Sequence, residues 1–326
     1  MKIGIIGGGV WGSALAKLLS YNKVYIFARD SKVVKAINDH HFNPKLKYAV
    51  FNNNVSALLD FDLLQDMDYV FIALPSQSIR NVLSSISFEN TKKEIIIASK
   101  GIEIDSGLLL SEVVKETTKS KNISILSGPC FSHEVAQNLP TAATFASSNK
   151  RSFENISKLF QSKNFRMYYS EDIIGAQIGG ALKNIYAIAA GITEGLNLGE
   201  NARSALVTRS IVELVRFANF FRANQETIFG LSGLGDLILT CNSLKSRNTN
   251  FGKKIANTKF ENYEDILNTQ QITEGYFTVK AVNSIAEENK INMPIMKSVY
   301  NILYKNHDIK NEIKELMNRP LIEEKI

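Results

Sequence analysis

The sequence predicts an α/β domain with a doubly wound, mostly parallel sheet, followed by an all-α domain. In the first half, short β-branched runs alternate with segments of helical spacing, which is typical of βαβ units. After Glu171 the strand signals fade and long helical patterns replace them. The 326 residues are enough for two domains. We expect residues 1–170 and 171–326 to form them, without a low-complexity linker or an internal repeat.

Short apolar runs bounded by turn residues predict the strands. These runs are Lys2–Ile6, Lys23–Phe27, Tyr69–Ala73, Glu94–Ala98, Ile123–Leu126, Thr141–Ala146 and Phe165–Tyr169. Helical spacing between them predicts Val10–Ser20, Lys32–Asp39, Ser76–Ser85, Leu108–Thr118 and Arg151–Gln161. In the second half the same spacing is clearest over Ile173–Ile192, Ala205–Arg222, Leu237–Leu244 and Tyr276–Glu288.

Composition excludes several classes of protein. Hydrophobic residues make up 44% and charged residues 21% of the chain, as in ordinary globular proteins. The net charge of +6 is modest, and no basic run carries the interleaved aromatics of a nucleic-acid platform. Cys130 and Cys241 form no disulfide framework, and neither they nor the four histidines have metal-ligand spacing. The opening run MKIGIIGGG predicts a strand rather than a signal peptide. We therefore expect a cytoplasmic protein without a metal, a nucleic-acid partner or a membrane span.

The run from Gly7 to Gly12 fits G-x-G-x-x-G directly between a predicted strand and a predicted helix. In this motif Gly7 makes the tight turn, Gly9 lets the backbone approach a pyrophosphate, and Gly12 permits close helix–strand contact. The helix N-terminus then presents amide donors to the phosphates. This context favours a Rossmann-type dinucleotide site over a plain glycine-rich turn.

The second predicted strand is followed by Arg29 and Asp30, where an acidic residue would hold the ribose 2′-hydroxyl. Arg29 suits a 2′-phosphate and therefore NADP, whereas Asp30 keeps NAD open. An exposed ion pair between the two residues is the structural alternative. The preference between the two cofactors stays undecided.

Lys183 is the only charged residue between Asp172 and Glu194, in an apolar stretch that Gly191 is expected to close. An ammonium among so much apolar surface is costly unless it is used or paired. A buried lysine can have its pKa lowered toward neutrality, which suits a general acid/base. The alternative is a core lysine that reaches solvent or a buried carboxylate. A membrane span is rejected because a central lysine would cost about 3 kcal/mol.

Other polar groups follow the predicted strands or the glycine-dense segment from Gly230 to Asp236. Lys100 is expected at the carboxyl end of a strand, where open α/β sheets bind ligands, although a surface lysine is the simpler reading. Asp236 follows glycines that would bring backbone close to a ligand, but by default it would cap a helix. Arg247 offers a planar fork for a phosphate or carboxylate, with Asn248 as a neutral partner.

In their order and spacing, these segments resemble NAD(P)-dependent glycerol-3-phosphate dehydrogenase of the bacterial type. The residues that carry the resemblance are G-G-G-V-W-G at 7–12, S-K-G-I-E at 99–103, S-G-P-C-F-S-H-E-V-A at 127–136, A-L-K-N at 181–184, G-L-S-G-L-G-D-L-I-L-T-C at 230–241, S-R-N at 246–248 and I-T-E-G at 272–275. Where the family loop usually reads G-P-S-F-A, this chain has Cys130 for the serine and Ser132 for the alanine. A thiol is a weaker donor than a hydroxyl, so the role of Cys130 is open.

The resemblance implies a Rossmann-type domain and a helical domain like that of 6-phosphogluconate dehydrogenase. It implies Lys183 as the proton donor and acceptor, with Asp236 and Asn184 orienting Lys183 and the substrate hydroxyls. The implied contacts with the substrate are Lys100, Gly128, Cys130, Lys183, Asp236, Ser246, Arg247 and Asn248. The implied contacts with NAD or NADP are Gly7, Gly9, Trp11, Gly12, Arg29, Lys100, Ser132, Arg247, Ile272 and Glu274.

The reaction implied is reversible hydride transfer between NAD(P)H and dihydroxyacetone phosphate, which yields sn-glycerol 3-phosphate for phospholipid synthesis. One rival is a related 3-hydroxyacid or 6-phosphogluconate-type dehydrogenase, which the K-N pair at 183–184 and S-R-N at 246–248 disfavour. Another is a non-catalytic dinucleotide sensor, which would need no buried acid/base. The sequence leaves open whether the chain forms a homodimer.

Overall fold

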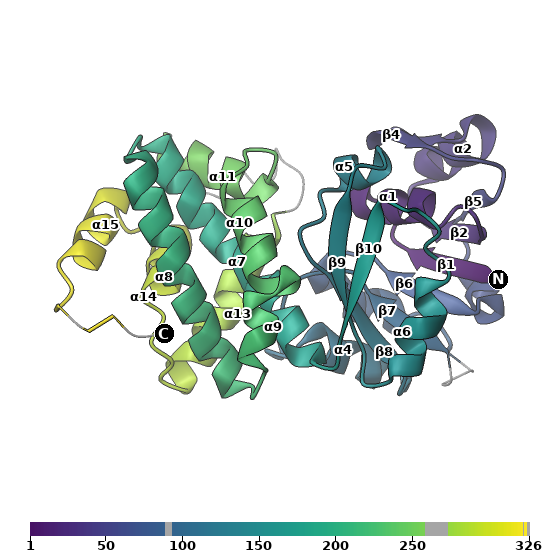
Figure 1. Cartoon of the computed structure of the whole chain (residues 1–326). Helices are drawn as coiled ribbons and strands as arrows, with labels where there is room; N and C mark the ends of the chain where they lie inside the picture. The colour runs from purple at the N-terminus through teal and green to yellow at the C-terminus, as the bar shows by residue number, and fades with distance from the viewer. Residues whose placement is uncertain (89–92, 258–272, 322, 325–326) are drawn as a thin grey trace. The chain divides into compact units, whose positions relative to one another are not determined.

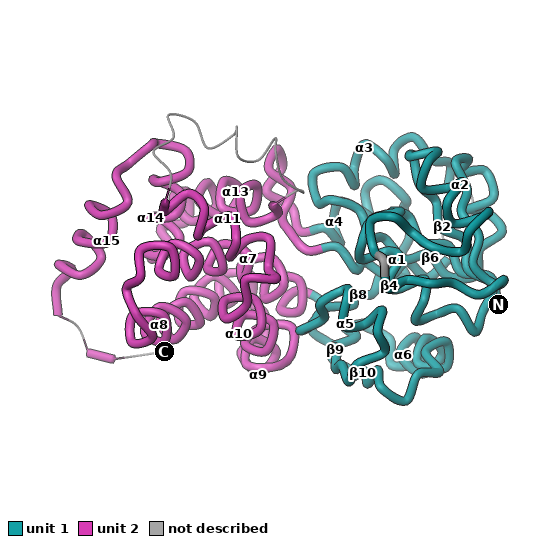
Figure 2. The backbone as a smooth tube through the Cα atoms, turned by 90° about the horizontal axis from the view of Figure 1, so that it is seen from above, with its two compact units in different colours: residues 1–99, 110–173 teal, residues 100–109, 174–326 magenta. Residues whose placement is uncertain are grey.

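A computed structural model gives the fold and describes residues 1–88, 93–257, 273–321 and 323–324. The chain forms two compact units, coloured separately in Figure 2. Unit 1 contains residues 1–99 and 110–173, and unit 2 contains residues 100–109 and 174–326. The sequence-based division near 170 did not anticipate that the short segment 100–109 groups with unit 2.

Unit 1 is built on one eight-stranded sheet (Figure 1). Its strands are β1 (Lys2–Ile6), β2 (Lys23–Phe27), β5 (Val55–Leu58), β6 (Tyr69–Ile72), β7 (Glu94–Ile97), β8 (Ile123–Ser127), β9 (Thr141–Ala146) and β10 (Phe165–Ser170). They lie in the order β10-β9-β8-β7-β6-β1-β2-β5, and only the β8–β9 pair is antiparallel. The predicted doubly wound, mostly parallel sheet is therefore confirmed. The strand order reverses between β1 and β6, so the carboxyl end of β1 lies at the topological switch point.

The helices of unit 1 connect these strands. They are α1 (Val10–Leu18), α2 (Ser31–His40), α3 (Ile79–Ser84), α4 (Leu110–Thr118), α5 (Ser132–Ala136) and α6 (Lys150–Ser157), with short 3₁₀ turns at Asp62–Asp66 and Ser76–Ser78. A two-stranded hairpin, β3 (Phe42–Asn43) and β4 (Leu46–Val50), follows α2 and contacts α1. Continuous β-branched runs such as Ile3, Ile5, Val24 and Ile26 are fully buried between the helices and form the core of this unit.

Unit 2 is helical in the residues that the structure describes. Its elements are α7 (Ile173–Gly195), α8 (Gly199–Phe220), α9 (Gln225–Phe229), the π-helical turn η3 (Leu231–Gly235), α10 (Asp236–Cys241), α11 (Arg247–Ala256), α13 (Glu274–Glu288), α14 (Pro294–Lys305) and α15 (Ile309–Met317). Their apolar faces form a second core around α7. The predicted change from strands to helices after Glu171 is confirmed.

The buried carboxylate of Glu213 joins α8 to the first turn of α14. Glu213 accepts hydrogen bonds from the backbone amides of Ile295 at 2.6 Å and Met296 at 3.1 Å. The hydroxyl of Tyr186 in α7 also donates to it, at 3.3 Å. Burial raises the pKa of Glu213 to about 7 against these hydrogen bonds. The carboxylate satisfies amides that the start of α14 leaves without a helical partner.

Helix α7 passes through the centre of unit 2. Gly191, expected to close the helix, lies inside it, and α7 continues to Gly195. A Cβ atom on Gly191 would lie 2.0 Å from the carbonyl oxygen of Thr249 in α11, so this glycine allows two helix backbones to approach. Among the described helices, α7 alone is long and apolar enough to cross a membrane, but 89% of its most apolar stretch is buried inside the protein. That burial is typical of a core helix.

All seven predicted strands are present, with ends that differ by at most one residue. Each segment that was predicted to be helical contains a helix in the structure, but several helices begin or end at residues other than those predicted. The segment from Ser76 to Ser85 is a 3₁₀ turn followed by α3, and α8 starts at Gly199 rather than Ala205. The hairpin β3–β4, strand β5 and helices α9, α11, α14 and α15 were not predicted.

Candidate functional site

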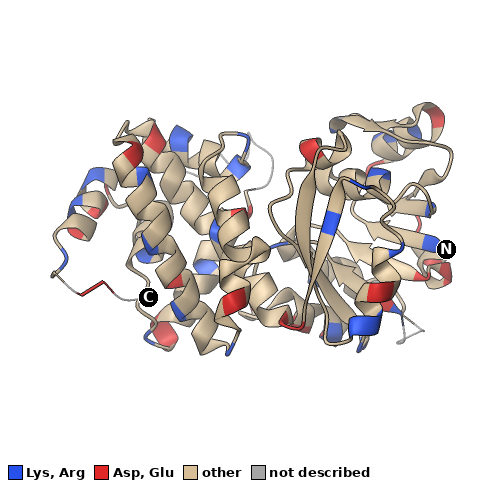
Figure 3. Cartoon of the chain, viewed as in Figure 1, with Lys and Arg blue, Asp and Glu red and all other residues tan. Residues whose placement is uncertain are grey.

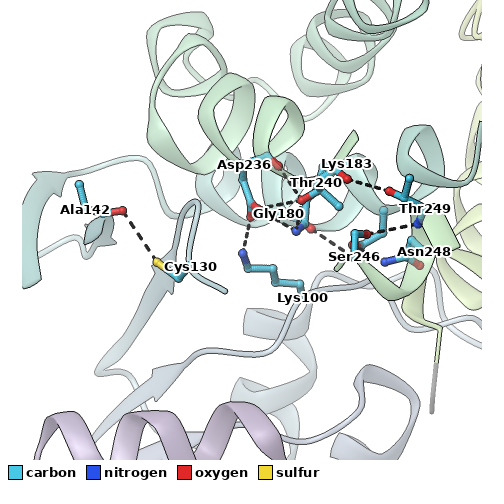
Figure 4. Close-up of polar contacts among 11 residues, drawn as sticks. Lys100, Cys130, Ala142, Gly180, Lys183, Asp236, Thr240, Ser246, Asn248 and Thr249 are labelled. Carbon is cyan, nitrogen blue, oxygen red and sulfur yellow. Dashed lines mark hydrogen bonds and ion pairs between the residues drawn. The ribbon is translucent and has the colours of Figure 1, made fainter. Parts of the chain in front are cut away.

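Lys183 lies at the middle of α7 with its residue surface 8% exposed. Its Nζ donates to Asp236 Oδ1 at 2.7 Å and to Thr240 Oγ1 at 2.7 Å (Figure 4). Both partners are on α10. The isolated charge that the sequence singled out therefore has a buried carboxylate and a hydroxyl as fixed neighbours.

Asp236 is shared between two lysines. Its Oδ1 accepts from Lys183, while its Oδ2 forms an ion pair with Lys100, whose side chain is 21% exposed. Burial alone would raise the pKa of Asp236, but Lys100 and Lys183 outweigh it and hold the pKa below its ordinary value. The expectation that Asp236 caps the following helix is wrong, because Asp236 is the first residue of α10 and the N-cap position is occupied by Gly235. Lys100 follows the carboxyl end of β7, as expected, and its segment groups with the helical unit.

Desolvation is the largest influence on Lys183 and lowers its pKa to about 8. The negative charge of Asp236 opposes this shift, and the positive charge of Lys100 adds to it. A lysine with a pKa near neutrality can be protonated in one step of a reaction and neutral in the next. Lys183, Lys100 and Asp236 together carry one excess positive charge, which suits an anionic ligand.

Sequence reasoning missed Thr240. Its hydroxyl lies 2.6 Å from the backbone oxygen of Asp236 and accepts a hydrogen bond from Lys183. Thr240 follows Asp236 by four residues, so the two share one face of α10. That spacing could have identified it once Asp236 was a candidate.

The glycine-dense segment before Asp236 forms the π-helical turn η3. A Cβ atom on Gly233 would lie 2.0 Å from the carbonyl oxygen of Ile228, and one on Gly179 in α7 would lie 2.5 Å from that of Ser232. The glycines between Gly230 and Asp236 were expected to bring backbone close to a ligand. Instead, Gly179 and Gly233 allow backbone to pack on backbone, which places Asp236 beside α7. π-Helical turns of this kind are frequent at functional sites.

Ser246, Arg247 and Asn248 form the start of α11. Ser246 caps the helix, with its Oγ accepting from the amide of Thr249 at 3.2 Å. Arg247 is an exposed residue, but desolvation of its guanidinium lowers its pKa, against the opposing charge of Glu274. Asn248 is buried; its Nδ2 donates to Asn184 Oδ1 at 2.8 Å, and its Oδ1 accepts from the amide of Gly275 at 2.9 Å.

Asn184 was expected to orient Lys183. Its carboxamide instead bonds to Asn248 at 2.8 Å and to the backbone oxygen of Gly180 at 3.4 Å. Asn184 therefore links α7 to α11, and through Asn248 to α13. Glu274 is the first residue of α13. Ile272, expected at the cofactor, lies outside the described residues.

In unit 1, the glycine-rich turn fits a dinucleotide pyrophosphate. Gly7 has φ +127°, and a Cβ atom on Gly12 would lie 2.0 Å from the carbonyl oxygen of Gly7. Around Gly9 a Cβ atom would meet nothing within 4 Å, and no side chain caps α1 there. The amides at the start of α1 are thus left to a ligand. Trp11 donates from Nε1 to the backbone oxygen of Ala98 at 3.0 Å, next to the end of β7.

The two charged residues after β2 do not pair with each other. Asp30 caps α2, with Oδ1 accepting from the amide of Lys32 at 3.1 Å. Its Oδ2 pairs with Lys45 at 3.2 Å, and Arg29 is exposed. The ion pair between Arg29 and Asp30 that the sequence left open is therefore replaced by one between Asp30 and Lys45.

The loop after β8 also has a constrained backbone. Gly128 has φ +147°, and a Cβ atom there would lie 3.0 Å from the Cα atom of Ala143. Cys130 Sγ lies 3.8 Å from the backbone oxygen of Ala142 (Figure 4). Ser132 begins α5. Among the described residues no group of three or more His, Cys, Asp or Glu side chains could hold a metal ion.

Charge is not concentrated on either unit. Figure 3 shows lysines and arginines scattered among aspartates and glutamates over both the sheet and the helices that the structure describes. A basic stripe of the kind that follows a nucleic-acid backbone is not seen there.

Comparison with known proteins gives one family over nearly the whole chain. Models of the N-terminal and C-terminal parts of NAD-dependent glycerol-3-phosphate dehydrogenase match residues 2–153 and 172–314. The glycerol-3-phosphate dehydrogenases [NAD(P)+] of Thermotoga sp. and Erythrobacter litoralis are 40% and 39% identical, covering 99% and 98% of this chain and 99% and 97% of their own length. Among solved structures, glycerol-3-phosphate dehydrogenase from Coxiella burnetii is similar with a TM-score of 0.92 and 34% identity, covering 98% of this chain and 99% of its own.

Proposed function

Because the chain belongs to the NAD-dependent glycerol-3-phosphate dehydrogenase family, and is an NAD(P)-dependent oxidoreductase acting on a CH–OH group, we propose that Lys183 is its general acid and base. The reaction is reversible hydride transfer between NAD(P)H and dihydroxyacetone phosphate, giving sn-glycerol 3-phosphate for phospholipid synthesis. The observation that carries the proposal is the buried contact of Lys183 with Asp236 and Thr240.

When bound, the reduced nicotinamide supplies a hydride to the carbonyl carbon of the substrate. Negative charge then grows on the carbonyl oxygen. A protonated Lys183 stabilises this charge and delivers its proton to the oxygen, and in the reverse direction the neutral amine takes that proton back. Asp236 and Thr240 hold the ammonium in one position, so little reorganisation is needed at the moment of transfer.

We assign the substrate phosphate to the start of α11. Arg247 begins this helix, and the planar fork of donors on its guanidinium suits a phosphate. The carboxamide of Asn248 is engaged within the protein, so we assign to this residue the task of fixing α11 against α7 and α13. Lys100 adds a cation within unit 2, and Gly128, Cys130 and Ser246 complete the proposed substrate contacts.

We assign the dinucleotide to the glycine-rich turn. Gly7, Gly9 and Gly12 would hold the pyrophosphate, and Trp11 and Arg29 would border the remaining parts of the cofactor. Lys100, Ser132, Arg247, Ile272 and Glu274 complete the proposed cofactor contacts. We propose these small molecules as the partners of the protein, and we place it in the cytoplasm.

The direct test is Lys183→Ala. Asp236 keeps Lys100 as its counter-ion in this variant, so no buried charge is left alone and the fold should persist. Loss of a general acid that also stabilises charge should reduce kcat for dihydroxyacetone phosphate by at least ~10³-fold. NADPH binding, followed by fluorescence titration, should stay close to that of the wild type.

Lys253→Ala is a matched control, because this lysine pairs with Glu194 on the same unit and should leave kcat unchanged. Near-wild-type turnover by Lys183→Ala with an intact circular dichroism spectrum would remove Lys183 from the mechanism.

A further inference from the structure

Lys45 lies between the two strands of the hairpin β3–β4, and a buried side chain holds this turn in place. Asn43 is fully buried; its Nδ2 donates to the backbone oxygen of Gly8 at 3.1 Å and to Ser13 Oγ at 2.6 Å. Its Oδ1 accepts from the amide of Lys45 at 2.9 Å. The hairpin is therefore tied to the glycine-rich turn itself.

The end of β2 is close to the same turn. A Cβ atom on Gly8 would lie 2.5 Å from the Cβ atom of Ala28, the residue before Arg29. Lys45 reaches this end of β2 from the hairpin and pairs with Asp30 at 3.2 Å. Arg29, Asp30 and Lys45 thus gather where the ribose of a dinucleotide lies in this type of fold.

The position of Lys45 changes what Asp30 can do. A carboxylate at this place normally accepts hydrogen bonds from the ribose hydroxyls and repels a 2′-phosphate. Here one carboxylate oxygen caps α2 and the other pairs with Lys45. The three residues carry one excess positive charge. An ammonium has three hydrogens, and 47% of the Lys45 side chain is exposed, so donors remain for a ligand.

We propose that Lys45 is a second cation, beside Arg29, that contacts the 2′-phosphate of NADP(H) and makes the enzyme prefer NADPH to NADH. The inference rests on the proposed dinucleotide site at the glycine-rich turn. An exposed ion pair contributes little to stability by itself. The buried carboxamide of Asn43 fixes the backbone of Lys45 against Gly8. A ligand that contacts both the hairpin and the glycine-rich turn explains this arrangement better than the ion pair does.

The test compares Lys45→Ala with Lys35→Ala, which removes the same charge from an exposed position on α2. The kcat/KM for NADPH and for NADH is measured with saturating dihydroxyacetone phosphate. Lys45→Ala should lower kcat/KM for NADPH by roughly tenfold, since a charged hydrogen bond is lost, and leave NADH unchanged or improved. Lys35→Ala should alter neither, and Lys45→Arg should restore most of the preference.

A second pair of variants separates direct contact from neutralisation of Asp30. Asp30→Asn keeps a good helix cap and removes the carboxylate charge. In this background Lys45→Ala should still lower kcat/KM for NADPH selectively, because the phosphate contact is still lost. The effect should also shrink as salt is raised, as expected for partly exposed charges.

Equal losses with both cofactors overturn the inference, and so does an effect that disappears in the Asp30→Asn background. A wild-type enzyme that turns over dihydroxyacetone phosphate with neither cofactor contradicts the proposed function instead. The two failures are therefore distinguishable in one set of measurements.

Discussion

At the scale of single residues, the shared carboxylate of Asp236 controls the charges around it. Two ammonium groups approach its two oxygens, so neither lysine is an uncompensated buried charge. Lys183 and Lys100 also act on each other, because the charge of Lys100 lowers the pKa of Lys183. The pKa of the proposed acid/base group is therefore lowered by a neighbouring cation that shares its carboxylate partner.

The pKa of Lys183 predicts opposite pH profiles for the two directions of the reaction. Reduction of dihydroxyacetone phosphate needs the protonated amine, so its kcat should fall as the pH rises through about 8. Oxidation of glycerol 3-phosphate needs the neutral amine, so its kcat should rise through the same range. The measurement is the steady-state rate in both directions between pH 6 and 10, under conditions where the chemical step limits kcat. This pH range extends roughly two units on either side of the pKa.

Lys100→Met provides the control for this prediction. Removing the charge of Lys100 should raise the pKa of Lys183, and the kcat profile measured at saturating substrate should shift to higher pH accordingly. Profiles that have the same slope in both directions would show that another group titrates.

The sequence identified some of these residues and not others, for physical reasons. Lys183 was found because a lone charge in an apolar helix has few explanations. Thr240 was missed because a threonine hydroxyl leaves no comparable signal until its partner is known. The pairing of Asn184 with Asn248 joins residues 64 positions apart, and such a contact depends on how α7 and α11 pack.

At the scale of secondary-structure elements, the packing of α7 depends on its small residues. Gly191 contacts the backbone of α11. In the same way Gly252 in α11 contacts the backbone of α7, since a Cβ atom on Gly252 would lie 2.0 Å from the carbonyl oxygen of Ile188. Two helices can approach this closely only where neither carries a side chain. The same approach brings Asn184 within reach of Asn248.

Gly191→Ala should therefore destabilise unit 2. The added methyl group meets backbone that cannot move without shifting α11, and overpacking of this kind costs about 1–3 kcal/mol or more. The free energy of unfolding in urea is the measurement, with Ser204→Ala on the exposed face of α8 as the control. An alanine variant as stable as the wild type would mean that the two helices separate at little cost.

Gly191 also shows why element ends were harder to predict than elements. A glycine that closes a helix and one that lets two helices approach look the same in a single sequence. The strands were predicted closely because buried parallel strands are continuous apolar runs. The strands of the hairpin β3–β4 are short and mix apolar with polar residues. The position of the hairpin depends on Asn43, whose hydrogen-bond partners lie 30 and 35 residues away in the sequence.

At the scale of the whole molecule, the chain crosses between the units more than once. Segment 100–109 follows β7 and precedes α4, both in unit 1, yet it belongs to unit 2. Ile102 is fully buried and, with Leu109, is part of the helical core. The segment also carries Lys100, so one of the two counter-ions of Asp236 comes from the first half of the sequence.

Ile102→Ala should consequently weaken the helical unit, although the residue lies in the first third of the chain. Truncation of a buried isoleucine costs about 2–5 kcal/mol. Hydrogen exchange should show faster opening in α7 and α13 than in the strands β1 and β6. Val24→Ala, which removes a buried side chain from the sheet core, is the reciprocal control and should accelerate exchange in the strands first.

The crossing at 100–109 has a consequence for synthesis on the ribosome. These ten residues are translated before any part of 174–326, the region that covers Ile102 and Leu109 in the finished protein. The nascent chain must hold apolar side chains in water until at least α7 has emerged, which is a period when aggregation competes with folding. A pause in translation between the two regions would lengthen that exposure, whereas rapid delivery of α7 would end it.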